Sequence, residues 1–337
     1  MIVIDGSAGE GGGQVLRTAL GLSLVTGQPF HIKNIRGKRK KPGLMRQHLT
    51  AVKAAAEIGR AEAIGAAIAS QDLLFRPQSV QPGAYHFAIG TAGSCTLVLQ
   101  AVLPALLQAT GPSELVLEGG THNPMAPPFD FLDKTFLPLL RQMGTRIDVE
   151  LVRPGFFPAG GGKIKVRVKP AATLAPLELI ERGTVDIEAK AVCAELPGHI
   201  ALRELAVCRR KLDIPAAKTK VEQLDCHGPG NVVEIFVHSA HLTETFIGFG
   251  QLNVSAEKVA SRTVAQVRTY LESEVPVGHH LADQLLVPLA LAGKGRFRTS
   301  KPSQHTLTNI EVIELFLDKK IEMERVGDKG WEVRIVG

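Results

Sequence analysis

His305 lies in a segment, residues 301–309, between two predicted elements: a strand over residues 295–299 and a helix over residues 307–316. This position predicts a loop between strand and helix, where α/β enzymes commonly keep reactive side chains. The pKa of a free imidazole lies near neutrality, so a histidine there can act as a base, a ligand or a nucleophile. Taken alone, the position favours the simpler alternative, a partly buried loop histidine that only forms hydrogen bonds.

A glycine-rich loop over residues 6–13 follows the first predicted strand and precedes the first predicted helix. Glycines allow close approach of the backbone to a ligand, and a helix N-terminus favours an anion. The loop lacks the Gly-Lys-Ser/Thr of a P-loop, and Gln14 stands where a dinucleotide fingerprint needs its last glycine. A simple tight turn is therefore the alternative. Glu10 stands out, because a carboxylate among glycines can hold Mg²⁺ beside the phosphates of a nucleotide.

The next connection is strongly basic, with six Lys or Arg residues among the eleven residues 36–46. Such a cluster at a helix start suits phosphate recognition, and arginine can bind a phosphate through two parallel hydrogen bonds. Arg17, one turn into the first predicted helix, can face the same pocket. The absence of interleaved aromatic residues favours capture of one phosphorylated terminus over a stacking platform for single strands. A solvated loop and a nuclear-localisation signal are the alternatives.

Further polar residues interrupt apolar elements. Gln100 is a polar amide in an apolar helix and needs a partner, which can be core backbone or a ligand. Residues 119–128 form a proline-rich loop able to wall a pocket. His279 and His280 precede Asp283 at a helix start, where capping explains the carboxylate as well as catalysis does. A zinc site there lacks an HExxH motif or a cysteine partner.

Length and composition limit the protein class. The 337 residues, of which 45% are hydrophobic, allow about two domains with a full core, and the net charge of +6 permits an anionic partner. The four cysteines form no CxxC pair and no zinc spacing, which indicates reduced thiols in a cytosolic protein. The N-terminal residues predict a strand rather than a signal peptide, and no apolar run is long enough for a transmembrane helix.

The elements that must position these residues fall into three βαβαββ units. The first is predicted as a strand at 2–5, a helix at 14–26, a strand at 29–34, a helix at 44–58 and strands near 61–76. The second is predicted as a strand at 85–89, a helix at 95–108, a strand at 114–119, a helix at 128–143 and strands near 146–151 and 163–168. The third is predicted as a strand near 177–181, a helix at 279–291, a strand at 295–299, a helix at 307–316 and strands near 320–324 and 331–336.

Residues 184–274 interrupt the third unit. They predict a strand at 185–192, a helix at 199–212, strands at 232–237 and 242–248, and a helix at 255–273. We interpret this stretch as a small α+β domain inserted into a catalytic domain made of residues 1–183 and 275–337. It carries no recognisable chemical motif.

Six separated motifs together resemble the RNA 3′-terminal phosphate cyclase family. They are Asp5-Gly6 with Gly9-Glu10-Gly11-Gly12-Gly13-Gln14, Lys41-Pro42-Gly43-Leu44 with Arg46-Gln47-His48-Leu49, Gly93-Ser94-Cys95-Thr96, Pro158-Ala159-Gly160-Gly161-Gly162, Leu281-Ala282-Asp283-Gln284, and His305 with Leu307-Thr308-Asn309. Each motif alone is weak, but all six in this order are specific, and they span nearly the whole chain.

The resemblance implies an α+β fold of α/β-type units: three βαβαββ repeats, akin to the C-terminal domain of a translation initiation factor, with a thioredoxin-like insertion. It also implies a reaction in which ATP adenylates a histidine, AMP passes to an RNA 3′-phosphate, and the neighbouring 2′-hydroxyl closes a 2′,3′-cyclic phosphate. The implied partners are ATP and RNA with a 3′-phosphate end, with Mg²⁺ or Mn²⁺ as cofactor.

The resemblance assigns roles by motif. His305 is the expected nucleophile, and Glu10 is the expected metal ligand. The expected residues for the RNA end and its phosphate are Arg17, Arg36, Arg39, Arg46, Gln47 and His48. The expected adenylate pocket comprises Gln100, Pro127, Phe131, His280, Leu281, Ala282, Asp283 and Gln284. His280 stands where bacterial relatives are expected to place a tyrosine against adenine, which puts the ATP affinity and the nucleotide preference in question.

Two other classes compete with this hypothesis. The first is a catalytically inactive relative that acts as a scaffold in ribosomal RNA processing, which would lack the nucleophilic histidine. The second is an enolpyruvyl transferase, which uses related units but needs no histidine acceptor. The sequence leads us to expect a cytoplasmic protein without a membrane anchor, and it leaves a homodimer open.

Overall fold

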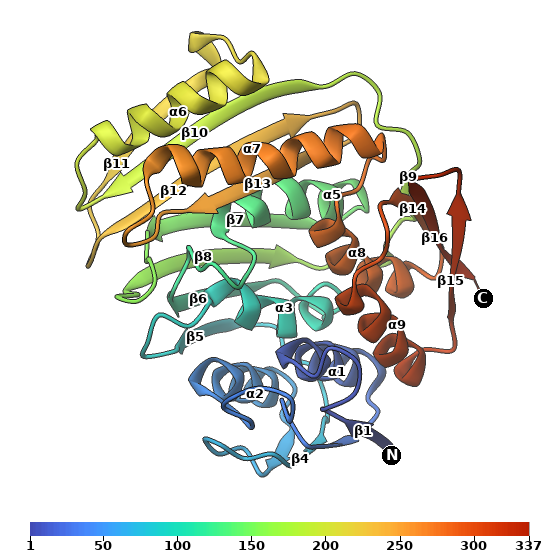
Figure 1. Cartoon of the computed structure of the whole chain (residues 1–337). Helices are drawn as coiled ribbons and strands as arrows, with labels where there is room; N and C mark the ends of the chain where they lie inside the picture. The colour runs from blue at the N-terminus through green and yellow to red at the C-terminus, as the bar shows by residue number, and fades with distance from the viewer. Residues whose placement is uncertain (337) are drawn as a thin grey trace.

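Four four-stranded sheets, with helices between and over them, make up the computed structural model, which describes residues 1–336 and has a mixed α/β architecture (Figure 1). The first sheet is formed by the N-terminal 76 residues, whose elements are β1 (Ile2–Asp5), α1 (Gly13–Thr26), β2 (Phe30–Lys33), α2 (Arg46–Ile58), β3 (Glu62–Ile64) and β4 (Leu73–Arg76). Its strand order is β1-β2-β4-β3, with β1 and β2 parallel and the other pairs antiparallel.

The next two sheets have the same order and the same strand directions. One contains β5 (Ala84–Ala88), α3 (Cys95–Leu106), β6 (Ser113–Gly119), α4 (Phe129–Phe131), the π-helical turn η1 (Leu132–Phe136), α5 (Leu137–Gln142), β7 (Arg146–Arg153) and β8 (Gly162–Lys169). The other contains β9 (Glu178–Leu179), α8 (His279–Ala292), β14 (Gly295–Thr299), α9 (Gln304–Phe316), β15 (Lys320–Val326) and β16 (Gly330–Val336). In each, the parallel pair is joined through a helix, as a parallel crossover requires.

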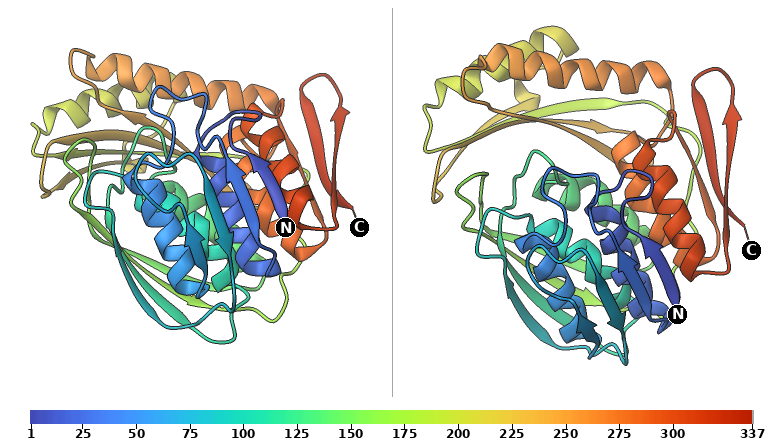
Figure 2. Two further views of the ribbon diagram at one scale, coloured as in Figure 1. Left: turned by 90° about the horizontal axis from the view of Figure 1, so that it is seen from below. Right: turned by 60° about the horizontal axis from the view of Figure 1, so that its bottom comes forward.

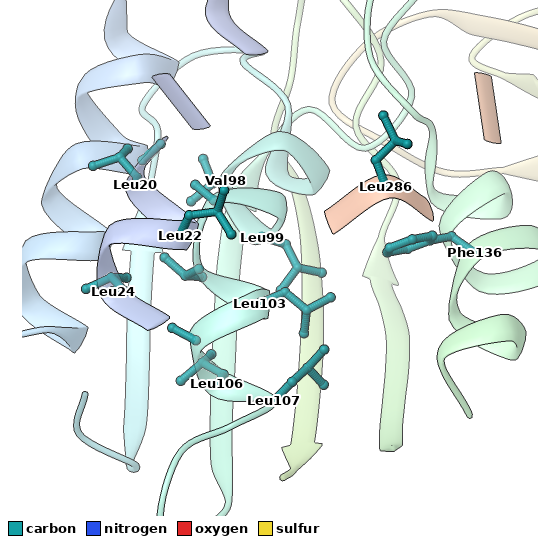
Figure 3. Packing of buried hydrophobic residues seen from close by; sticks show 14 of the residues in the cluster. Leu20, Leu22, Leu24, Val98, Leu99, Leu103, Leu106, Leu107, Phe136 and Leu286 are labelled. Atoms are coloured by element: carbon teal, nitrogen blue, oxygen red, sulfur yellow. The ribbon is translucent and has the colours of Figure 1, made fainter. Parts of the chain in front are cut away.

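The helices of these units fill the space between the three sheets (Figures 1 and 2). Helix α1 contacts α3 and α9, so helices from all three units meet at one place. Figure 3 shows Leu22 of α1 beside Val98 and Leu99 of α3, and Phe136 and Leu286 close to each other in the same buried cluster. Burial of each such side chain contributes about 1.5–3 kcal/mol, and this cluster therefore fixes how the three units are arranged.

The fourth sheet belongs to the segment between β9 and α8. Its elements are β10 (Asp186–Ala194), α6 (His199–Leu212), the 3₁₀ turn η2 (Ala216–Lys218), β11 (Thr219–Leu224), β12 (Gly230–His238), β13 (Thr243–Phe249) and α7 (Ala256–Ser273). The strand order is β11-β10-β12-β13. Helices α6 and α7 cover the outer face of this sheet and enclose a separate hydrophobic core, while the edge strand β13 contacts α4, η1 and α7 (Figure 1).

Three local predictions were wrong. The helix containing His305 begins at Gln304, not at residue 307, because the Ser303 hydroxyl accepts a hydrogen bond from the Thr306 amide and caps the first turn. The predicted helix at 128–143 is divided into α4, the π-helical η1 and α5. Strand β11 was missed, since none of its residues is buried and most of them are polar, which leaves little hydrophobic signal.

None of the helices within residues 1–336 is long and apolar enough to cross a membrane.

Candidate active site

A cavity of about 320 Å³ opens where the first helices of the three units meet β13 of the fourth sheet. This volume is in the range of small-molecule sites. Its lining comes from every sheet-containing part of the molecule: Gln14, Arg17, Leu97, Gln100, Pro124, Met125, Ala126, Pro127, Pro128, Phe131, Glu244, Thr245, Phe246, Ile247, Phe249, Gln266, Gly278, His279, His280, Asp283, Gln284 and His305. The site therefore exists only once all of these parts are folded together.

His305 lies in the first turn of α9, and its side chain is 48% exposed at the cavity. Its Nδ1 is 2.8 Å from Oε1 of Gln14. An amide oxygen only accepts hydrogen bonds, so Nδ1 of the neutral imidazole carries the proton and donates it to Gln14. The lone pair is then on Nε2, which is the tautomer needed for a nucleophile at that atom.

Glu10 faces the same nitrogen. Its Oε1 lies 3.7 Å from Nε2 of His305, the carboxylate also contacts Arg39, and its side chain is only 13% exposed. The glycine-rich loop is docked on α9, because the Glu10 amide donates to Thr308 Oγ1 over 3.1 Å. Gly9 has a φ of +53°, and a Cβ there would lie 2.1 Å from that hydroxyl oxygen, so this close approach requires glycine.

A chain of polar side chains crosses the floor of the cavity and joins the three units. Arg17 Nε of α1 donates to Gln100 Oε1 of α3 over 2.8 Å, and Gln100 Nε2 donates to Gln284 Oε1 of α8 over 2.6 Å. Gln100 thus has the partners that an amide in an apolar helix needs. Burial lowers the pKa of Arg17 to about 10, so the guanidinium stays charged at neutral pH and offers an anion site at the cavity.

His48 lies beside Arg17. The Met45 amide donates to His48 Nδ1 over 3.3 Å, which leaves the proton of the neutral ring on Nε2. A Cβ at Gly13 would lie 2.5 Å from that Nε2 and 2.9 Å from Arg17 Nη1, so both side chains point at the start of α1. Burial, reinforced by the charges of Arg17 and Arg36, lowers the pKa of His48 to about 3. His48 is therefore a neutral hydrogen-bond donor at neutral pH.

The other residues predicted from the basic connection, Arg36, Arg46 and Gln47, do not line the cavity. Arg36 has a φ of +55° and donates through Nη1 to the carbonyls of Lys41 and Gly43, which holds the loop in shape. Gln47 Oε1 accepts from the Ser94 amide over 2.6 Å. Arg46 is exposed to solvent.

The first turns of α8 form another wall of the cavity. The Asp283 carboxylate accepts hydrogen bonds from the hydroxyls of Ser303 and Thr306 and so ties α8 to the start of α9, and burial raises its pKa. The rings of His279 and His280 have centroids 3.9 Å apart. Burial, with the charges of His279 and His305, lowers the pKa of His280 to about 4. His280 is thus an uncharged flat ring at neutral pH, suited to contact a nucleobase.

Of the residues expected from the sequence, the cavity brings together Arg17, Gln100, Pro127, Phe131, His280, Asp283, Gln284 and His305. Glu10, Arg39 and His48 lie beside this group, as described above. Leu281 and Ala282 are fully buried in the main core and do not line the cavity. They face away from it because they occupy the core side of α8, between His280 and Asp283.

Two groups of lining residues were missed from the sequence. Gln14 was noted as the residue that breaks a dinucleotide fingerprint and as the end of one family motif, but nothing local indicates that it bonds His305. The lining residues of β13 and α7, such as Glu244 and Gln266, lie in the segment that carries no motif. They contribute side chains that reach the cavity only through tertiary packing.

Fold and site together define a mixed α/β protein in which three sheets of the same strand order and a fourth sheet contribute to a cavity, where His305 presents its Nε2. A family model described as RNA 3′-terminal phosphate cyclase matches residues 8–323. The chain belongs to the RNA 3′-terminal phosphate cyclase family.

Two relatives bear the same description. The chain is 52% identical over 325 residues to an RNA 3′-terminal phosphate cyclase of Koribacter versatilis (strain Ellin345), which covers 96% of this chain and 92% of the relative. It is 50% identical over 330 residues to an RNA 3′-terminal phosphate cyclase of Ectopseudomonas mendocina (strain ymp), which covers 97% of this chain and 96% of the relative.

Proposed function

We propose that the protein is an ATP-dependent RNA 3′-terminal phosphate cyclase that works through a covalent histidine–AMP intermediate on His305. The observation that carries this proposal is the pair of contacts on His305. Gln14 holds the proton on Nδ1, and the unprotonated Nε2 faces a carboxylate in a nucleotide-sized cavity. Family membership supplies the reaction class.

In the first step, the lone pair of His305 Nε2 attacks the α-phosphorus of ATP. A P–N bond forms, the bond between the α-phosphorus and the bridging oxygen breaks, and diphosphate leaves. The imidazolium that forms stays hydrogen-bonded through Nδ1–H to Gln14 Oε1, so its orientation does not change. The product is a phosphoramidate, which transfers its AMP readily to another nucleophile.

In the second step, an oxygen of the RNA 3′-phosphate attacks the phosphorus of the histidine-bound AMP, and the P–N bond breaks. The 3′-phosphate then carries a good leaving group. In the third step, the 2′-hydroxyl attacks the 3′-phosphorus, the bond to the AMP oxygen breaks, AMP leaves, and the hydroxyl proton passes to solvent. This closure is intramolecular, with an effective molarity on the order of 10⁵ M or more, so the chain's task is to bind and orient the RNA end.

The residues on the α1 and α2 side support a role in binding the RNA end. Arg17 stays charged and His48 stays a neutral donor at neutral pH, and both point at the start of α1. Arg39 and the exposed Arg46 add positive charge nearby. We assign Arg36 and Gln47 to this side as well, where their hydrogen bonds to Gly43 and Ser94 shape the loop around the phosphate.

The residues on the α3 and α8 side support an adenylate pocket. Pro127, Phe131 and His280 offer apolar or flat surfaces for a base, while Gln100, Asp283 and Gln284 offer polar atoms for the sugar. We assign Leu281 and Ala282 an indirect part, because their burial in the core holds the face of α8 that carries His280 and Asp283.

A divalent cation fits beside Glu10. This carboxylate is mostly shielded and faces the nucleophilic nitrogen, and Mg²⁺ commonly uses one or two carboxylates together with water and substrate phosphates. We propose Glu10 as a ligand of Mg²⁺ or Mn²⁺, which supplies positive charge against the departing diphosphate when bound. Glu10 then exchanges its contact with Arg39, whose guanidinium becomes available for a phosphate.

The decisive experiment mixes the protein with Mg²⁺ and ATP labelled at the α-phosphate, without RNA, and follows the label after denaturation. We expect label on the protein that is lost in acid, survives alkali and is absent in His305→Ala. His86→Ala is the matched control, since His86 is a surface histidine on β5, paired with Glu118. If the wild type binds ATP but takes up no label, the nucleophile assignment is wrong and a scaffold role in RNA processing replaces it.

We further propose that residues 1–183 and 275–337 form the catalytic domain, a threefold repeat like that of the C-terminal domain of a translation initiation factor, and that residues 184–274 are a thioredoxin-like insertion. The strand order shared by three sheets and the separate core of the fourth support this division. A cytoplasmic location agrees with four unpaired cysteines. A homodimer is a further proposal, which sedimentation or light scattering tests directly.

A further inference from the structure

The segment over residues 184–274 contributes side chains to the cavity lining, and it also contacts two of the cavity walls from behind. Two buried polar contacts join it to two different cavity walls. One involves Lys190 of β10 and the wall that carries Phe131, and the other involves Glu244 of β13 and the wall that carries His280.

The first contact is an ion cluster. Lys190 Nζ lies 2.6 Å from Asp130 Oδ1 and 2.7 Å from Glu234 Oε2, and Nε2 of His122 lies 3.5 Å from Asp130 Oδ2. Glu234 is completely buried, and the Asp130 side chain is 9% exposed. Asp130 directly precedes Phe131, so the cluster fixes the backbone at the point where that ring enters the cavity.

The buried charges of this cluster stabilise the contact between Lys190 and Asp130. Burial acts to raise the pKa of Asp130, but the His122 hydrogen bond and the Lys190 charge outweigh it and hold the pKa below its usual value. His122, Asp130 and Glu234 lie within 4.8 Å of one another, as metal ligands would, and the Lys190 ammonium supplies the positive charge there. Burial raises the pKa of Glu234 to about 8, so the Lys190 ammonium chiefly balances Asp130, and its removal leaves that buried carboxylate without its ammonium partner, which is unfavourable.

The second contact is at the start of α8. Glu244 is 3% exposed, and its Oε1 accepts a hydrogen bond from the Gly278 amide over 2.6 Å. Gly278 is the N-cap residue of α8 and has no side chain to satisfy the free amides of the first turn. A Cβ at Gly278 would lie 3.0 Å from Glu244 Oε1, so the two segments are in close contact. His279 and His280 follow immediately along the chain.

Both walls need support from outside their own segment. The wall at Phe131 belongs to α4, a helix of three residues that continues into a π-helical turn, and such short pieces have few hydrogen bonds of their own. The His280 wall is the first turn of a helix, where backbone amides lack intrahelical partners. The contacts of Lys190 and Glu244 supply external partners at these two places.

We propose that Lys190 and Glu244 are positioning residues for the nucleotide cavity, through which the inserted segment holds the Phe131 wall and the His280 wall at the spacing that ATP needs. This inference rests on the proposed function. It assigns to the segment without motifs a part in nucleotide binding that none of its residues reveals in the sequence.

The test measures ATP affinity by calorimetry, and the rate of protein labelling at saturating ATP, for Lys190→Met, Glu244→Leu and Glu244→Gln. We expect Lys190→Met and Glu244→Leu to weaken ATP binding about tenfold or more, the equivalent of ~1.4 kcal/mol, with the saturated labelling rate within about twofold of the wild type. Glu244→Gln keeps an oxygen for the Gly278 amide and should rescue the affinity. Lys218→Met is the matched control, because Lys218 of η2 pairs at the surface with Asp186, which lies on β10 like Lys190.

A second measurement does not depend on ATP. Hydrogen exchange without ligand should become faster at the amides of residues 129–131 in Lys190→Met and at residues 278–281 in Glu244→Leu, with the main core still protected. If Lys190→Met does not fold, the double variant Lys190→Met/Glu234→Gln removes one buried carboxylate together with its cation and is measured instead. Unchanged exchange and unchanged affinity in the folded variants overturn the proposal. A wild type that neither binds ATP nor takes up label overturns the proposed function, while the exchange result still tests the two contacts.

Discussion

Nδ1 of His305 and Oε1 of Gln14 are 2.8 Å apart, although the two residues are separated by 291 positions in the chain. Gln14 is at the start of α1 in the first unit, and His305 is in the first turn of α9 in the third. The contact sets the tautomer of the imidazole and the direction of Nε2, so the reactivity of His305 depends on how the first and third units dock.

The hydrogen bond to Gln14 predicts a rate effect. In Gln14→Ala the ring of His305 loses its acceptor, and we expect the rate of protein labelling by ATP to fall about 10- to 100-fold, the range known for partners that orient a metal-bound imidazole. Single-turnover labelling at saturating ATP measures this. Gln28→Ala is the control, since Gln28 also bonds α9, but at the carbonyl of Phe316. An equal loss in both variants would indicate general loosening of α9 instead.

The carboxylate of Glu10 predicts metal dependence. Chelation of divalent cations should abolish labelling of the wild type, and Glu10→Gln should need a higher Mg²⁺ or Mn²⁺ concentration for half-maximal labelling, about tenfold or more, because one anionic ligand is lost. A metal titration of the labelling rate checks both. Glu62→Gln, which removes a surface partner of Arg76, should leave the titration unchanged. Identical metal curves for Glu10→Gln and the wild type would exclude Glu10 as a ligand.

The low pKa of His48, about 3, predicts a pH-dependent loss of stability. The unfolded chain binds a proton at His48 below about pH 6.5, whereas the folded protein does not until the pH approaches 3. The contribution to stability is therefore fully present above pH 6.5 and is lost as the pH falls toward 3, by at most about 1.4 kcal/mol per pH unit.

Denaturant unfolding of the wild type and His48→Gln between pH 7 and 4 measures the pH-dependent contribution of His48 to the free energy of unfolding. The stability of the wild type should fall more steeply than that of the variant, because glutamine does not titrate. Parallel curves would show that folding does not lower the pKa of His48.

Replacement of His280 by a larger aromatic residue should raise the affinity for ATP. A tyrosine offers more aromatic area to adenine than an imidazole, and aromatic pairs contribute about 0.5–1.5 kcal/mol beyond area burial, so His280→Tyr should bind ATP several-fold more tightly. Calorimetry with ATP and GTP gives the affinity and the base preference together. His279→Tyr serves as the neighbouring control, and a gain in that variant alone would place the base against His279.

Much of this protein follows from local sequence. Alternating and helical periodicities predicted most elements of the three units, since each pattern is set by neighbours within a few residues. The contiguous motifs around Glu10, Arg46 and His305 indicated the family, because glycines, charges and a histidine at short spacing describe a site even before the fold is known. The helix start at Gln304 was missed, although the capping Ser303 was present in the sequence.

Tertiary structure alone decided how these pieces become one site. The chain from Arg17 through Gln100 to Gln284 joins helices of three units, and the pair of Lys190 and Asp130 joins segments 60 residues apart. Such contacts depend on how buried faces pack, and no local pattern encodes the partner of a given side chain. The segment over residues 184–274 shows this best, because its sequence carries no motif, yet its fold places Glu244 and its neighbours against the cavity.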